Sequence, residues 1–503
     1  MTTLDGRVPV TEVVKICPRH PSRIWSLPSL TPPKSPYAFD LVVEVGRRRF
    51  LDHQQFQEIH DQLAQRGLSI PARSLQHLAD RFALYTVAVH LESLPTLIRK
   101  RLREQGGYVL LLDGTGRAGR MTLQLTDGWS GLVLLSAHIV QESEPEVTPH
   151  LRRLHAALGR PVAAVRDAGG GLSAAVSQVW LGLYQVLCHF HFLRAEGLKL
   201  FEPLYPRLRT EIDRSGVKGR LRALRTQLRK IAHPTPEQRK ALGWTEEILG
   251  TLKSGKGRVY PFHLPAWKLY RRCGKVLSRL ERLGRRSGRP GALGRLKGIL
   301  LRLFLPSKYR SLPEGLSQGL GERWRWFERI RKGLRYRNGP IPLSTRGVLH
   351  DVALHRGRRR LKWLVDKLTK AGAGSSRSPT VRNLKTVLRT LARDLWVHRG
   401  ELFAPNVKLK VGKRTVHHLL PRTTAMAEQE FRKLRRHGRR IRGMAQVEGQ
   451  VQREGPAMML IENLHDPRYV REVYGSMAGM AKRFAQVKST TVVEAKRITG
   501  LLQ

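Results

Sequence analysis

Two aspartates follow apolar runs that are typical of buried β-strands. Asp113 ends the run Tyr108–Leu112, and Asp167 ends the run PVAAVRD at residues 161–167. Because open α/β sheets bind ligands in a crevice at the carboxyl ends of their strands, we expect both carboxylates to point into one crevice. Such a pair suits Mg²⁺, which takes a few hard oxygen ligands and keeps several waters. An aspartate here can also cap the following turn, and spacing alone does not decide between the two roles.

Four segments, two of which contain these aspartates, follow one another in a characteristic order. They are YVLLLDGTG from Tyr108, RDAGGGLSAAVSQVW from Arg166, Cys188 to His191, and TTAMAE from Thr423. The series resembles the DDE transposases of bacterial insertion sequences and their Mutator-like relatives. In that superfamily the first Asp ends a strand, the second opens a D-x-G-x-G-L-x-x-A run, a C-x-x-H signature follows, and the closing Glu lies in a T-T-N-x-x-E helix beyond a long helical insertion. The resemblance covers residues from about 106 to 442, with departures at Ala168 and Ala425.

The resemblance implies a catalytic triad of Asp113, Asp167 and Glu428. These carboxylates would hold two Mg²⁺ ions, for which we expect Mn²⁺ to substitute. Glu430 is the alternative third acid. Residues two apart on a helix point about 200° away from each other, so only one of the two glutamates can face the aspartates. Glu428 is preferred because it completes the Thr-Thr motif.

Two further pairs have the spacing of metal ligands. Cys188 and His191 make a poor zinc site by themselves, so we expect them either to brace the strand beside the active site or to act near the scissile DNA. Cys17 and His20 have the gap of half a zinc knuckle, but no second cysteine pair accompanies them. The front of the chain is therefore interpreted as a degenerate zinc-ribbon-like region.

The charge of the chain predicts a polyanionic partner. Its 503 residues include 92 Lys and Arg against 39 Asp and Glu, a formal net charge of +53. Residues 196–420 alone hold 54 of these bases and 15 of the acids. Bases recur there among large apolar residues, as in Arg323–Phe327 and Leu361–Leu364, which indicates folded helices with basic faces that contact phosphates.

Composition excludes several other classes of protein. A hydrophobic content of 41% argues against a disordered basic tail, and three cysteines exclude a disulfide scaffold. No apolar run approaches the roughly 20 residues that span a bilayer. The first residues carry charges where a signal peptide needs an apolar stretch, so we expect a cytoplasmic, nucleoid-associated bacterial protein without a membrane partner.

Hydropathy patterns indicate the elements that position these residues. Residues 37–51 alternate like a short β-hairpin with its turn near Gly46. Residues 54–90 form two helices around Gly67, either a DNA-binding helix-turn-helix or an ordinary helical hairpin. From residue 106, three strands, a helix and a fourth strand follow in the order of an RNase H-like core.

The expected fold is therefore α/β plus α, an RNase H-like core interrupted by a large basic helical insertion. We divide the chain into an N-terminal hairpin region (1–53), a helix-turn-helix region (54–105), the first part of the core (106–195), the basic helical insertion (196–420), and the closing catalytic helix with C-terminal elements (421–503).

By the resemblance, the protein would bind terminal inverted repeats, cleave a phosphodiester at each end and join the 3′-hydroxyl to target DNA. Its partner is double-stranded DNA, and paired ends imply a homodimer or higher oligomer. The rival functions are an RNase H-fold nuclease or resolvase without strand transfer, and a non-catalytic DNA-binding protein derived from a transposase. The residues expected to contact DNA are Arg73, His77, Arg81, Arg422, Arg432, Lys433, Arg435, Arg436, Arg439 and Arg440.

Overall fold

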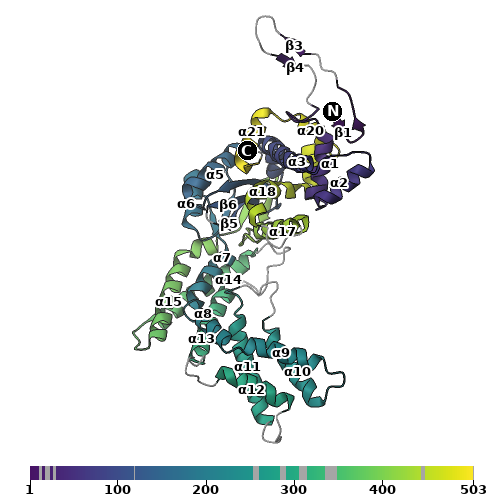
Figure 1. Cartoon of the computed structure of the whole chain (residues 1–503). Helices are drawn as coiled ribbons and strands as arrows, with labels where there is room; N and C mark the ends of the chain where they lie inside the picture. The colour runs from purple at the N-terminus through teal and green to yellow at the C-terminus, as the bar shows by residue number, and fades with distance from the viewer. Residues whose placement is uncertain are drawn as a thin grey trace. The chain divides into compact units, whose positions relative to one another are not determined.

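The chain divides into two compact units (Figure 1). Unit 1 comprises Met1–Cys188, Leu343–Asp351 and Ala404–Gln503, and unit 2 comprises His189–Pro342 and Val352–Phe403. The computed structural model describes residues 1–10, 14–16, 23–25, 30–117, 119–252, 260–283, 291–304, 314–334, 348–442 and 448–501.

A five-stranded mixed sheet forms the centre of unit 1. Its strands, in the spatial order β7-β6-β5-β8-β9, are β5 (Val109–Arg117), β6 (Arg120–Asp127), β7 (Val133–Ile139), β8 (Ala163–Arg166) and β9 (Gln185–Leu187). β6 is antiparallel to both β5 and β7, whereas β8 is parallel to β5 and β9 is parallel to β8. The four strands expected between residues 106 and 167 are confirmed. β9 was not predicted, because a strand of this length is too short to show a period.

Helices cover both faces of this sheet (Figure 1). They are α5 (Glu144–Leu158) and α6 (Gly170–Val179) on one face, and α17 (Ala425–Arg442) and α18 (Glu448–Ile461) on the other. Arg435 of α17 donates a hydrogen bond to Thr115 of β5. The preceding residue, Gly114, faces the opposite side, where the side chain of Glu142 covers it just before α5.

The chain leaves and re-enters unit 1 beside one apolar cluster. It leaves after Cys188, belongs to unit 1 again at Leu343–Asp351, and returns for the last time at Ala404. Val186 and Ala404 are buried together in this cluster, with Leu111 and Val165 of the sheet. The long excursion of the chain through unit 2 therefore starts and ends at the same part of the core of unit 1.

The predicted β-hairpin over residues 37–51 is wrong, because this segment forms the helix α1 (Phe39–Phe50). Leu41, Val42 and Val45 are fully buried. Their spacing places them on one helix face, and burial of that face outweighs the strand preference of valine. Two small hairpins do lie nearer the N-terminus, formed by β1 (Thr2–Thr3) with β2 (Gly6–Arg7) and by β3 (Val14–Ile16) with β4 (Arg23–Trp25).

Gly46 has a packing role instead of the predicted turn role. It lies where α1 contacts α3 (Ala72–Ser93), and a Cβ added to it would overlap the ring of Phe82. Glycine at this position allows the two helix backbones to approach closely.

The two helices expected within residues 54–90 are present as α2 (Phe56–Gln65) and α3. Every residue from Phe82 to Leu91 is buried, so most of α3 is a central helix of unit 1. α3 then continues through the π-helical turn η1 (Leu94–Ile98) into α4 (Arg99–Glu104). Residues 54–105 are therefore part of unit 1 and do not form a separate compact domain.

The C-terminal part of unit 1 adds a hairpin and several short helices. These elements are β10 (Val407–Val411), β11 (Arg414–His418), the 3₁₀ helix η4 (Glu462–His465), α19 (Pro467–Tyr474), α20 (Met480–Ala485) and α21 (Ser489–Thr499). The hairpin β10–β11 lies within residues 196–420, which we had expected to be entirely helical.

Unit 2 is all-helical in its described residues. Its helices are α7 (His189–Phe201), α8 (Tyr205–Arg214), α9 (Val217–Arg229), α10 (Pro236–Gly250), α11 (Pro265–Leu283), α12 (Ala292–Phe304), α13 (Glu314–Gly333), α14 (Asp351–Gly372), α15 (Pro379–Val397) and α16 (Arg399–Leu402). Arg323, which the sequence places among the bases of a surface, is instead 1% exposed. It donates hydrogen bonds to the carbonyl oxygen of Leu200 at 2.9 Å and to Asn383 at 2.8 Å, so it ties α13 to α7 and α15.

None of the described helices combines the length and the apolar character that crossing a bilayer requires.

A buried histidine ties α3 to the sheet. The Nε2 atom of His90 lies 2.9 Å from the carbonyl oxygen of Leu134 in β7, and its Nδ1 atom lies 2.9 Å from the hydroxyl of Tyr469 in α19. Burial lowers the pKa of His90 to about 4. The neutral ring therefore donates from Nε2 to the carbonyl and accepts the tyrosine proton at Nδ1.

Gly46→Ala should lower the free energy of unfolding by about 1–3 kcal/mol, because the added methyl group overpacks the contact between α1 and α3. Denaturant unfolding followed by circular dichroism measures this change. Gly449→Ala in α18 is the matched control, because the space around Gly449 is open. The control should be neutral or stabilising by up to about 1 kcal/mol. Equal effects of the two substitutions would contradict the packing role of Gly46.

Acid should destabilise the fold through His90. The unfolded histidine has a pKa near 6.5, so the stability that depends on the neutral ring is complete above that pH. It is lost as the pH falls towards 4, by up to about 3 kcal/mol. His90→Gln should therefore be less stable than the wild type at pH 7 but lose less stability between pH 6.5 and 4.5. Parallel pH profiles of the two proteins would contradict this assignment.

Candidate functional site

The two aspartates singled out in the sequence lie at equivalent positions on adjacent parallel strands. Leu111 of β5 pairs with Val165 of β8, so counting two residues further sets Asp113 opposite Asp167, just beyond the end of β8. The structure thus brings both residues to the same edge of the sheet, and the crevice expected there stays a prediction.

Asp113 continues the apolar face of the sheet that Val109, Leu111 and Val165 form. Asp113 is only 6% exposed. Its Oδ1 atom accepts a hydrogen bond from the backbone N–H of Gly114 at 2.9 Å. A carboxylate so deeply placed at a strand end is costly to bury unless charged or polar groups compensate it, which distinguishes it from an ordinary surface aspartate.

Asp167 has a local role as well. Its Oδ1 atom accepts a hydrogen bond from the backbone N–H of Gly169 at 2.7 Å, directly before α6. This contact is the turn-capping role that spacing alone allowed. It is compatible with a second role for the carboxylate, since each carboxylate oxygen has two acceptor positions.

Cys188 anchors the start of α17 beside these strand ends. Its backbone N–H donates to the carbonyl oxygen of Arg166 at 2.8 Å. Its sulfur lies 3.4 Å from the backbone nitrogen of Thr424 and 3.6 Å from the hydroxyl of the same residue. Cys188 and Thr424 are both fully buried. The Thr-Thr motif is therefore held close to the residue that precedes Asp167.

Glu428 lies on the face of α17 that is directed to this edge of the sheet. Glu428 and Arg435 are seven residues apart, so they lie on the same side of the helix. Arg435 donates to the hydroxyl of Thr115 at 2.6 Å, two residues beyond Asp113 on the same strand face. The carboxylate of Glu428 forms an ion pair with Arg432 at 3.1 Å.

Glu430, the alternative third acid, has different surroundings. Its carboxylate accepts hydrogen bonds from Lys433 at 2.9 and 3.1 Å. Burial raises the pKa of Glu430, and the neighbouring carboxylate of Glu462 adds to this effect. Glu462 in turn pairs with His437 at 3.3 Å. These contacts place Glu430 in a separate network between α17 and η4.

The donor chemistry at the strand ends fits Mg²⁺ in part. Two carboxylates are enough to hold this ion when waters and substrate phosphates complete its shell. Among the described residues, however, no three His, Cys, Asp or Glu side chains are grouped closely enough to hold a metal ion. The structure therefore pairs Asp113 with Asp167 at one edge and does not gather Glu428 into a preformed cage with them.

Two neighbours of this edge were missed in the sequence. Gln124 lies directly opposite Asp113 on β6, is fully buried, and donates to the hydroxyl of Thr126 at 3.1 Å. The register of the β5–β6 hairpin would have identified it. Glu142 lies against Gly114 and its backbone lies against Gly171 at the start of α6. Glu142 belongs to a loop between β7 and α5, where the sequence has no periodic signal.

The pair Cys188 and His191 is divided between the two units. Cys188 belongs to unit 1 and contacts Thr424 before α17, whereas the expected structural role was to brace the strand beside the active site. His191 belongs to unit 2, where its ring packs edge-on against Phe190. Cys17 and His20 lie outside the described residues.

Predicted DNA contacts on α3 differ in their exposure. Arg73 and His77 are exposed and lie one turn apart. Arg81 is partly buried and donates to the carbonyl oxygen of Pro33 at 3.3 Å. Burial lowers the pKa of Arg81.

Around α17, Arg422 departs from the expectation of a DNA contact. It is 1% exposed and donates a hydrogen bond to Asn406 at 3.4 Å, so it supports the loop before α17 from inside. Lys433 is half-buried and engaged with Glu430. The other predicted bases of the helix are exposed; these are Arg432, Arg435, Arg436, Arg439 and Arg440.

Comparison with known proteins finds no family model that matches the chain and no curated protein with significant similarity to it.

Proposed function

We propose that the protein is a DDE-type transposase, with Asp113 and Asp167 as the first two catalytic acids. The observation that carries this proposal is the register of β5 and β8, which sets the two aspartates opposite each other at one edge of the sheet. Two acids 54 residues apart in the chain meet there on a face that also carries the start of α17.

The sheet topology supports an RNase H-like core as the fold of unit 1. Three antiparallel strands, β5 to β7, are followed by α5, the parallel strand β8, α6 and the parallel strand β9. This is the order that the sequence motifs imply for the core, with the second aspartate after the fourth strand. The helix that would carry the third acid follows unit 2 along the chain.

In this proposal Asp113 and Asp167 hold Mg²⁺, and Glu428 completes the set of ligands. Bound Mg²⁺ would activate the attacking water or 3′-hydroxyl and stabilise the leaving oxygen. Arg432 compensates the charge of Glu428 in the absence of metal, and Arg435 fixes the helix against β5. Arg436, Arg439 and Arg440 extend along α17 and would hold phosphates of the bound DNA without reading its sequence.

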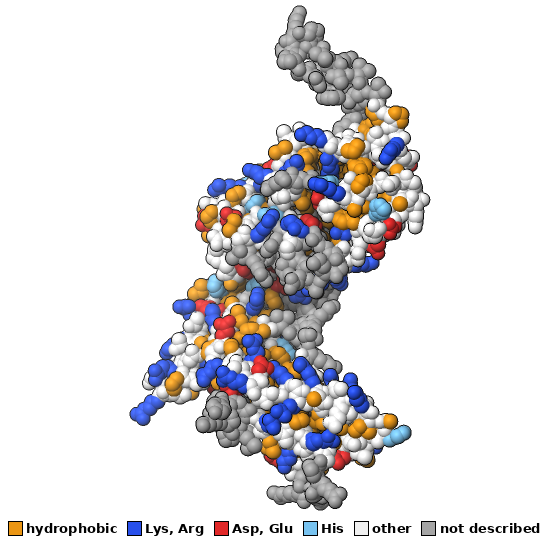
Figure 2. All heavy atoms as spheres, in the orientation of Figure 1, with side chains coloured by type: hydrophobic (Ala, Val, Ile, Leu, Met, Phe, Trp, Pro, Cys, Tyr) orange, Lys and Arg blue, Asp and Glu red, His pale blue; other side chains and the backbone are white. Residues whose placement is uncertain are grey.

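Unit 2 would supply much of the electrostatic affinity for DNA. Figure 2 shows Lys and Arg side chains spread over its visible face. On α14 the bases Arg356, Arg359, Arg360 and Lys362 are exposed. None of these four has an acidic partner in the described part of the chain, so each can neutralise a phosphate and release a counterion. Binding of two transposon ends would require a homodimer or higher oligomer.

The active-site assignment is tested by isosteric substitution of the acids. Asp113→Asn, Asp167→Asn and Glu428→Gln should each lower Mg²⁺-dependent nicking of a plasmid that carries the DNA flanking the gene by at least about 10³-fold. That loss corresponds to several kcal/mol of transition-state stabilisation. Their affinity for the same DNA, measured by gel mobility shift, should stay close to that of the wild type.

Glu430→Gln is the matched control, because it changes a glutamate of the same helix that belongs to the Lys433 and Glu462 network. It should keep nicking within a fewfold of the wild type. Persistent nicking by Asp113→Asn would contradict the assignment of the site. Loss of activity in Glu430→Gln with activity kept in Glu428→Gln would move the third acid to position 430.

A strand-transfer assay tests the class of reaction. The wild-type protein should join a pre-cleaved end with a free 3′-hydroxyl to a target plasmid in the presence of Mg²⁺. Cleavage without a joined product would indicate a nuclease or resolvase. Tight DNA binding with neither product would indicate a non-catalytic DNA-binding protein, the alternative that the ungrouped third acid favours.

A further inference from the structure

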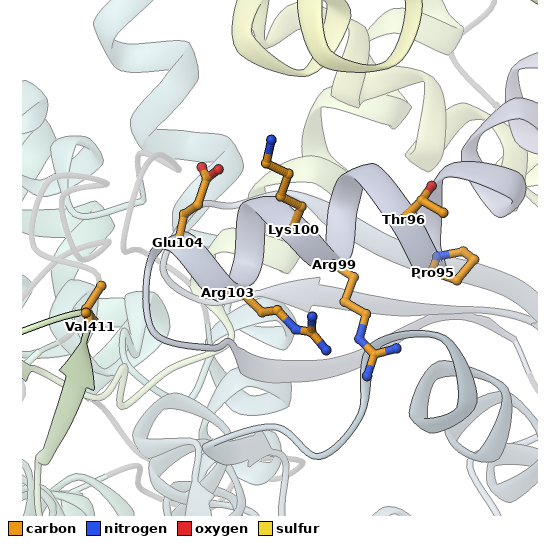
Figure 3. Close-up of a pocket in the computed structure, with 8 residues that line it drawn as sticks. Pro95, Thr96, Arg99, Lys100, Arg103, Glu104 and Val411 are labelled. Atoms are coloured by element: carbon orange, nitrogen blue, oxygen red, sulfur yellow. The ribbon is translucent and has the colours of Figure 1, made fainter.

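A cationic pocket lies on unit 1 where α4 meets the tip of the β10–β11 hairpin. It has a volume of about 440 Å³, and its walls include Arg99, Lys100, Arg103, Val411 and Gly412. Figure 3 shows Arg99 and Arg103 pointing to the same side of α4, whereas Lys100 and Glu104 point to the other side. Arg99 and Arg103 are four residues apart, so their guanidinium groups lie one helical turn from each other.

The acidic side chains of this region are already paired, including Glu104, which also lines the pocket. Arg101 is 7% exposed and pairs with Asp466 at 2.6 Å and with Glu472 at 3.6 Å. Glu104 pairs with Arg468 at 2.7 Å. Arg101 and Glu104 of this short helix are therefore compensated by ion pairs.

Arg99 and Arg103 have no such compensation. In the described part of the chain neither side chain has a hydrogen-bond or ion-pair partner. The Nε atom of Arg99 is buried and unsatisfied. Two like charges one turn apart repel each other, and a buried donor without a partner is energetically unfavourable. An anion between the two groups would remove both costs.

The hairpin builds the opposite wall and adds further charge. Leu409 and Val411 lie against Gly106, where a Cβ would meet the Val411 side chain. On the hairpin, the bases Lys408, Lys410, Lys413 and Arg414 are exposed. The apolar residues thus fix the hairpin beside α4 while its bases stay in solvent.

The π-helical turn η1 contributes to this geometry. It interrupts the regular α-helical repeat between α3 and α4, and Pro95 and Thr96 from this turn line the pocket. Insertion of an extra residue in the repeat changes the direction in which every later side chain points. Arg99 and Arg103 consequently face the hairpin, while Arg101 faces its acidic partners.

We propose that Arg99 and Arg103 form a phosphate-binding site that is distinct from the candidate active site. The planar guanidinium group offers paired donors that match the oxygens of a phosphate. The ligand is either a backbone phosphate of nucleic acid or a free phosphate anion. The strand from Val109 to Asp113 alone spans about 13 Å at about 3.3 Å per residue, so the pocket beside Gly106 is separated from Asp113 by this part of β5.

The inference does not rest on transposition or on any catalytic step. A protein that binds nucleic acid without cutting it would use the same pocket. The active-site assignment is tested by the nicking activity of the acid variants, whereas this proposal is tested by DNA and phosphate binding. Each can therefore be contradicted without the other.

The nucleic-acid arm compares the salt dependence of binding to a random-sequence DNA duplex. Each lost phosphate contact makes the slope of log K against log salt concentration shallower by about 0.9. R99Q/R103Q should therefore have a slope shallower by about 1.8 than the wild type. K482Q/K488Q is the matched control, because it removes two exposed bases elsewhere on unit 1 and should leave the slope unchanged.

The free-anion arm uses inorganic phosphate at constant ionic strength, with chloride as the balancing anion. The unfolding midpoint of the wild type and of K482Q/K488Q should rise with phosphate concentration, and the rise should be smaller in R99Q/R103Q. Loss of this rise with an unchanged DNA slope would identify free phosphate as the ligand. A shallower slope of log K against log salt concentration in R99Q/R103Q would identify the nucleic-acid backbone as the ligand.

Equal behaviour of the pocket variant and the control variant in both arms would overturn the proposal. If R99Q/R103Q unfolds at a lower temperature in the absence of phosphate, R99Q alone is used. Its expected change of slope is about 0.9.

Discussion

The register of the central strand β5 is the constraint on which the rest of unit 1 depends. β5 pairs with antiparallel β6 from Leu110 to Arg117, but its pairing with parallel β8 runs only from Val109 to Leu111. Beyond Leu111, β5 stays paired with β6 but is no longer paired with β8. Asp113 lies where the two strands separate, with Gln124 opposite it on the side that stays paired. A shift of one residue would turn both the aspartate and the apolar face beneath it to the other side of the sheet.

The helix α17 completes this edge through contacts that do not depend on hydrophobic burial alone. The backbone N–H of Thr424, just before the first turn, donates to the buried sulfur of Cys188. Further along the helix, Arg435 donates to the hydroxyl of Thr115. Glu428 lies between these two anchors. Its position is thus set at both ends by side chains from the strands, while Glu430 is drawn into contacts with Lys433 and Glu462.

Arginine has two opposite roles in this chain. Arg323, Arg422 and Arg101 are almost fully buried and bind carbonyl, amide or carboxylate oxygens inside a unit. Others, such as Arg99 and Arg103, have no protein partner among the described residues. The net charge of +53 therefore contains a structural part that no external anion can reach. Counting bases along the sequence does not separate the two groups, because the pairing depends on which acids the fold brings near.

The sequence predicted the long apolar strands and the strongly amphipathic helices, because both have a period that local composition reveals. It failed for α1, where clustered valines suggested a strand, but burial of the face with Leu41, Val42 and Val45 favours the helix. β9 and the β10–β11 hairpin were missed because their residues are few or mostly exposed. For the site, two aspartates at strand ends were predictable from local pattern. The orientation of Glu428 relative to Glu430 needed contacts with Cys188, Thr115 and Glu462, which lie far away in the chain.

The shared cluster of Val186 and Ala404 has a consequence for how this chain can change over time. For unit 1, the polypeptide between them consists of two long loops divided by Leu343–Asp351, and the outer ends of these loops are held together in the cluster. The entropy of closing such a loop grows only logarithmically with its length. Whole helices could be gained, lost or exchanged in that excursion without altering the register of any strand, which makes it the region most open to evolutionary replacement.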